Sequence, residues 1–96
     1  MYARIATFEG DPANVDQAIE MVRGEVESGS QPPGLEGAKM MMRVDRQSGK
    51  GLGITLFESE EDMKRGDEEL SAMSPPSGTG RRTSVEFYEV PVHTLS

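Results

Sequence analysis

The alternation of short extended runs with amphipathic helical runs constrains this chain more than any other feature of its sequence. Residues 2–9 favour a strand, and Gly10 ends it. Asp11 as N-cap and Pro12 as first helical residue then predict a helix that runs to about Glu27. Its apolar positions, spaced i, i+3, i+4, i+7 and i+11, share one helical face: Val15, Ala18, Ile19, Val22 and Val26.

A hairpin is predicted in the middle of the chain. One strand is expected from about Glu36 to Arg46 and the next from Leu52 to Glu58, with a turn at residues 48–51 between them. Alternation in the first of these strands places two sets of side chains on opposite faces. One face takes Ala38, Met40, Met42 and Val44, and the other takes Lys39, Met41 and Arg43.

A second helix and a last strand complete the pattern. Ser59 is the expected N-cap of a helix that runs to about Met73, and Pro75–Pro76 ends it. Residues 82–92 predict the last strand. The order strand, helix, strand, strand, helix, strand predicts an α+β fold. Its architecture is a ferredoxin-like βαββαβ sandwich, with a four-stranded antiparallel sheet and two helices on one face.

The size of the chain favours self-association. Its 96 residues predict a single domain, residues 1–96. A domain this small hides only roughly 60% of the surface that its unfolded chain exposes, and no cysteine is present to add a disulfide. Both faces of the predicted sheet carry apolar residues, and the two helices cover one face. We therefore expect a homodimer with the sheets back to back.

The charge of the chain narrows the choice of partner. The formal net charge is −7, which argues against nucleic acid and against an anionic membrane surface. The sequence holds no apolar run long enough for a signal peptide or a membrane span. Together with the absence of cysteine, this predicts a cytoplasmic protein.

Three polar or glycine-rich features have structural interpretations. The run Gly49–Gly53 lies between two strands, so hairpin geometry accounts for it better than a phosphate loop. His93 is the only histidine, and no cysteine is available to complete a metal site with it. We therefore expect no metal and no cofactor. An acidic group falls on the second helix and predicts a solvated face: Glu58, Glu60, Glu61, Asp62, Asp67, Glu68 and Glu69.

Methionines provide the one candidate binding feature. They lie on the second strand and both helices, where they either fill the core or line a soft cleft between the sheet and the second helix. Gly66 leaves the apolar stripe of that helix thin, which favours the cleft. The residues expected to form or rim a substrate-binding cleft are Arg4, Met42, Arg43, Met63, Tyr88 and His93.

Several motifs carry a family resemblance. They comprise Pro33, Gly34 and Gly37, then Val44–Arg46 with a Ser-Gly-Lys turn, and then residues 53–62, GITLFESEED. In this order they resemble the dimeric α/β-barrel superfamily, and among its members the antibiotic-biosynthesis-monooxygenase-like domains. The resemblance implies a dimer whose two sheets form a barrel, with an apolar cleft between sheet and helices in each subunit. Characterised members oxidise aromatic polyketides without metal or flavin, degrade haem, or isomerise small ring compounds.

The sequence departs from some of those members. It has no tryptophan, no asparagine on the first strand and no histidine on the second helix, which argues against haem degradation. Two hypotheses stay open. One is a cofactor-independent monooxygenase-like protein for a small apolar aromatic or polyketide-like compound, in which Arg4 or Arg43 favours the deprotonated substrate. The other is a non-catalytic dimeric module that binds a small ligand or another protein. No catalytic residue is assigned.

Overall fold

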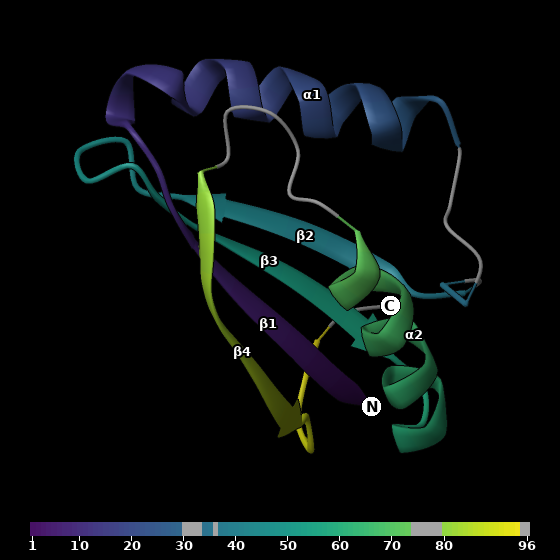
Figure 1. Cartoon of the computed structure of the whole chain (residues 1–96). Helices are drawn as coiled ribbons and strands as arrows, with labels where there is room; N and C mark the ends of the chain where they lie inside the picture. Colours follow the sequence, from purple (N-terminus) through teal and green to yellow (C-terminus); the bar gives the residue numbers. More distant parts are fainter. Residues whose placement is uncertain (30–33, 36, 74–79, 95–96) are drawn as a thin grey trace.

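The computed structural model describes residues 1–29, 34–35, 37–73 and 80–94. Its four strands are β1 (Tyr2–Glu9), β2 (Lys39–Val44), β3 (Lys50–Phe57) and β4 (Arg81–Glu89). Its helices are a short 3₁₀ turn η1 (Pro12–Asn14), then α1 (Val15–Glu27) and α2 (Glu60–Ala72). The strands form one antiparallel sheet in the order β2-β3-β1-β4 (Figure 1), which confirms the predicted ferredoxin-like α+β arrangement.

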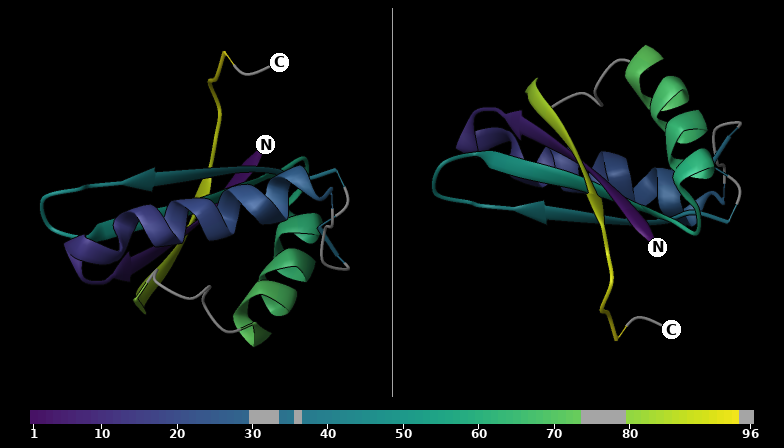
Figure 2. Two further views of the ribbon diagram at one scale, coloured as in Figure 1. Left: turned by 90° about the horizontal axis from the view of Figure 1, so that it is seen from above. Right: turned by 90° about the horizontal axis from the view of Figure 1, so that it is seen from below.

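The strand register assigns each side chain to a face of the sheet. Arg4 of β1 lies beside Thr55 of β3 and Phe87 of β4, and Thr55 lies beside Met40 of β2. Residues paired in this way project to the same side. Both helices lie on that side (Figures 1 and 2), which we call the helix side. The opposite side of the sheet, which no helix covers among the described residues, is the open face.

Local capping explains where the helices begin. The backbone N–H of Asp62 donates to Ser59 Oγ at 3.1 Å, so Ser59 is the N-cap of α2, as predicted. Asp11 accepts from the N–H of Ala13 at 2.9 Å, but it caps η1 rather than α1. The prediction of one helix from Pro12 was therefore wrong. The first turn closes as a tighter i→i+3 turn, and α1 begins at Val15.

Two predicted strands are shorter than expected. The second strand ends at Val44 rather than Arg46, because the Asp45 carboxylate accepts the N–H of Gln47 and turns the chain. The last strand ends at Glu89 rather than Val92. The N–H of Val90 still donates to the carbonyl of Met1, but the strand does not continue beyond this hydrogen bond. The predicted strand start at Glu36 and helix stop at Pro75–Pro76 lie outside the described residues.

The apolar core concentrates under α2. Leu35, Phe57 and Met63 form one buried cluster. Gly66 of α2 sits directly on it, because a Cβ at this position would overlap the Phe57 ring and lie 3.0 Å from Leu35 Cδ2. The absence of a side chain at Gly66 thus allows α2 to approach the sheet closely.

Candidate functional site

An apolar hollow of about 390 Å³ lies between α1 and the edge strand β2. Its volume falls in the range of small-molecule sites. Arg23 and Glu27 of α1 are the charged residues among those that line it. The others are apolar: Ile19, Val22, Val26, Met42 and Val44.

Glycines in β3 help to explain why the hollow forms at this place. On the helix side, Met42 lies beside Gly53, and Val44 lies beside Gly51. Neither glycine projects a side chain toward α1, so the surface of β3 beside Met42 and Val44 is formed by backbone alone. A Cβ at Gly53 would meet the Phe8 ring at 3.4 Å, so the ring of Phe8 lies over this glycine.

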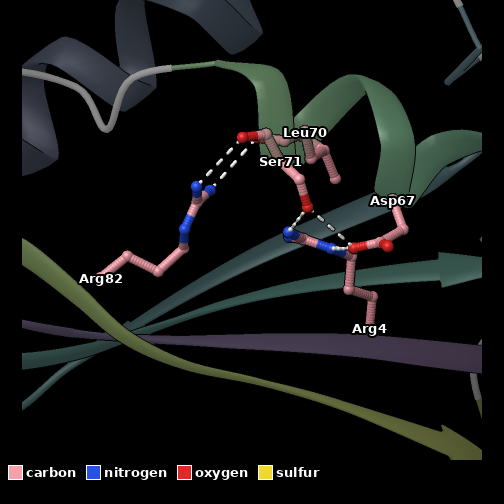
Figure 3. A network of polar contacts seen from close by, with 5 residues as sticks. All are labelled: Arg4, Asp67, Leu70, Ser71 and Arg82. Carbon is pink, nitrogen blue, oxygen red and sulfur yellow. Dashed lines mark hydrogen bonds and ion pairs between the residues drawn. The ribbon is translucent and has the colours of Figure 1, made fainter.

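A polar network fixes α2 to the sheet (Figure 3). Arg4 is buried, and its Nε donates to Asp67 Oδ1 at 2.7 Å. Its Nη2 donates to Ser71 Oγ at 3.3 Å, and Ser71 Oγ in turn donates to Asp67 Oδ1 at 3.1 Å. The buried guanidinium therefore has a charge partner, as a cation removed from water requires.

Arg82 of β4 binds the same helix at its C-terminal end. Its Nη1 donates to the carbonyl of Leu70 and its Nη2 to the carbonyl of Ser71, both at 3.2 Å (Figure 3). The last turn of α2 holds no basic residue of its own. Arg82 thus satisfies orphan carbonyls at the negative end of the helix dipole from a neighbouring strand.

The structure distributes the six predicted binding residues over different places. Met42 lines the hollow, whereas Arg4 and Met63 lie beneath α2. Arg43 and Tyr88 belong to the open face, since they lie beside Leu52 and Ala3. His93 is exposed in the segment after β4, which leaves the body of the molecule (Figure 2). These six side chains do not converge on one site.

The missing side chain of Gly66 does not leave a cleft beneath α2 at this position. The space that the missing side chain was expected to leave is filled by Phe57 and Leu35. The described hollow instead lies under α1.

The open face carries a hydrogen-bonded acidic pair. The Tyr88 hydroxyl donates to Glu86 Oε2 at 2.6 Å. This hydrogen bond, and next the charge of Glu86, raise the pKa of Tyr88 above its ordinary value. Tyr88 is therefore protonated at neutral pH and does not serve as a base there.

Two sets of site residues were not predicted from the sequence. Ile19, Val22 and Val26 were interpreted only as the apolar face of a helix. The many apolar residues on this helix and on the second strand could have indicated a site between the two. Asp67 was placed on a solvated acidic face, but it forms the ion pair with Arg4. No sequence pattern singles out this aspartate from its acidic neighbours, since the pairing depends on how α2 docks.

The described residues contain no group of three or more His, Cys, Asp or Glu side chains arranged to hold a metal ion. Within the same part of the chain, neither helix is long and apolar enough to cross a membrane.

A scan against protein-family models found no match, and a search of curated proteins found none either.

Proposed function

We propose that this protein binds a small apolar molecule in the hollow between α1 and β2, without catalysing its conversion. The apolar lining of that hollow is the observation that carries the proposal. Burial of apolar ligand surface supplies roughly 25 cal/mol per Å², and Met42 offers a side chain that adapts to varied shapes. The charged lining residues, Arg23 and Glu27, would orient a polar end of the ligand.

Thermal unfolding with a panel of apolar aromatic compounds tests this function. A compound present at a hundred times its Kd stabilises the folded protein by about 2.7 kcal/mol, which is readily seen as a rise in Tm. In Val22→Glu, a charge in the apolar lining should abolish that rise. The matched control is Met73→Glu, an exposed position beyond α2. If both variants respond to ligand like the wild type, the hollow is not the binding site.

A second candidate is the cofactor-free oxygenase that the resemblance to antibiotic-biosynthesis-monooxygenase-like domains implies. Its support is that resemblance, which implies that Arg4 or Arg43 favours a deprotonated substrate; in the structure the Arg4 cation is buried and paired with Asp67. One oxygen atom of O₂ would enter an anthrone-type substrate and the other would leave as water, with the substrate as reductant. Oxygen uptake above the buffer rate that falls in Arg4→Met would establish this activity, and uptake equal to buffer would exclude it for the compounds assayed.

We further propose that the open face forms the contact of a homodimer, as in dimeric α/β barrels. The opposite charges on the two edge strands would favour a two-fold arrangement in which β2 of one copy lies over β4 of the other. Arg43 on β2 would then approach Glu86 on the partner's β4. The centre of the open face is supplied by apolar residues of β1 and β3: Ile5, Leu52, Ile54 and Leu56.

A further inference from the structure

The free edge of β2 is unusually apolar. Beyond β2 the sheet has no further strand among the described residues. Met40, Met41 and Val44 are 53%, 46% and 38% exposed, so half of this six-residue strand consists of exposed large apolar side chains. Proteins usually protect such an edge with proline, charge or a bulge, because its unpaired backbone groups can template another strand.

The opposite edge of the sheet carries more of those protections than β2, whose charged residues are Lys39 and Arg43. The pairing of β4 with β1 contains a register shift between Thr7 and Phe8, and β4 bears charges at both ends and in its middle. The pairing of β2 with β3 is regular throughout and contains no proline. The two edges thus differ in how readily they would accept a further strand.

Backbone geometry identifies which groups β2 offers. The N–H of Asp45 donates to the carbonyl of Lys50, so Asp45 directs its backbone groups toward β3. In an antiparallel ladder this orientation alternates along the strand. The backbone N–H and C=O groups of Met40, Met42 and Val44 therefore point outward, away from β3.

Self-pairing of this edge is best in one register. An antiparallel copy centred on Met42 would pair Met42 with Met42, Met40 with Val44, and Lys39 with Asp45, through about six backbone hydrogen bonds. The register centred on Met41 uses fewer outward groups and places Lys39 opposite Arg43, a like-charge contact. The pKa of Asp45 is lowered by backbone N–H groups of Gln47 and Ser48, so its carboxylate is charged at neutral pH.

From this edge we infer a second association surface: β2 pairs antiparallel with β2 of another copy of this chain, in the register centred on Met42. The contact joins two sheets edge to edge and is separate from the open face. Its two-fold axis, perpendicular to the sheet, keeps the helices of both copies on one side. The two hollows under α1 then lie next to each other, since Met42 lines each of them.

Single cysteines test the register directly, because the chain has no cysteine of its own. In the inferred pairing the two Met42 Cα atoms are about 5.5 Å apart, within the range a disulfide spans. Met42→Cys should therefore form a covalent dimer under mild oxidation. Met40→Cys should remain monomeric on a denaturing gel, because its own copy lies roughly 13 Å away along the strands. Adding Val44→Cys to Met40→Cys should restore the cross-link.

The experiment separates this contact from the others. Met42 lies on the helix side, so a dimer formed only through the open face cannot bring the two Met42 side chains together. Absence of a covalent dimer in Met42→Cys, with its circular dichroism and Tm close to those of the wild type, would overturn the inference. So would equal cross-linking of Met40→Cys alone. Ligand binding is not required for the cross-link, and loss of the proposed function would leave this result unchanged.

Discussion

At the scale of single residues, two glycines within helices have opposite roles. Gly66 is packed against Phe57 and Leu35, whereas no atom lies within 4 Å of a Cβ built on Gly24. Both are helical, so alanine should gain about 1 kcal/mol of helix propensity at either position. At Gly66 this gain is opposed by overpacking of the core, which typically costs 1–3 kcal/mol.

We therefore predict that Gly66→Ala lowers the free energy of unfolding by up to about 2 kcal/mol, while Gly24→Ala raises it by about 0.5–1 kcal/mol. Urea unfolding followed by circular dichroism measures both changes. A Gly66→Ala protein as stable as Gly24→Ala would show that α2 does not rest on Phe57.

The role of Gly66 could not be predicted from the sequence. The sequence showed a gap in the apolar stripe, and a gap fits either an open cleft or a close approach of backbone to an aromatic ring. Only the position of the Phe57 ring decides between the two. Met42 was predicted to line a cleft between the sheet and α2, and in the structure it lines the hollow under α1.

At the scale of elements, α2 is attached to the sheet by two arginines from different strands. The order of helices and strands was predictable, since periodicity and capping are local. The attachment was not, because Arg4 and Arg82 are distant from α2 in sequence. The Arg4–Asp67 pair is partly buried, with the Asp67 side chain 30% exposed, so its removal should matter more than that of an exposed pair.

We expect Asp67→Ala to lower the free energy of unfolding by about 1–3 kcal/mol, because Arg4 stays buried without its carboxylate. The double variant Arg4→Met with Asp67→Ala should be more stable than the sum of the single changes indicates. The control is Lys64→Ala, which removes an exposed pair with Glu60 on the same helix and should change stability by less than about 0.5 kcal/mol. Additive effects of the Arg4 and Asp67 changes would contradict a coupled pair.

At the scale of the whole molecule, both proposed contacts arise from the same shortage of covering layers. Two helices protect one side of a four-stranded sheet, and no helix or strand of the described residues covers the open face or the β2 edge. If both contacts form at once, the product is a tetramer. In it, two dimers joined through their open faces are connected by pairing of their β2 edges. The apolar content of both sheet faces was visible in the sequence, but the exposed edge was not, because strand order depends on long-range pairing.

We predict that Ile54→Asp, at the centre of the open face, converts the wild-type assembly into species of half its mass. A buried, unpaired carboxylate on each side of a two-fold contact would cost several kcal/mol of association free energy. Sedimentation velocity measures the mass, and circular dichroism verifies that the variant is folded. Met73→Asp introduces the same charge at an exposed position directly after α2 and should sediment like the wild type. Because Ile54 does not lie on the β2 edge, Ile54→Asp combined with Met42→Cys should still form the disulfide-linked pair. An Ile54→Asp protein of wild-type mass would exclude the open face as the contact and leave the β2 edge to account for any association.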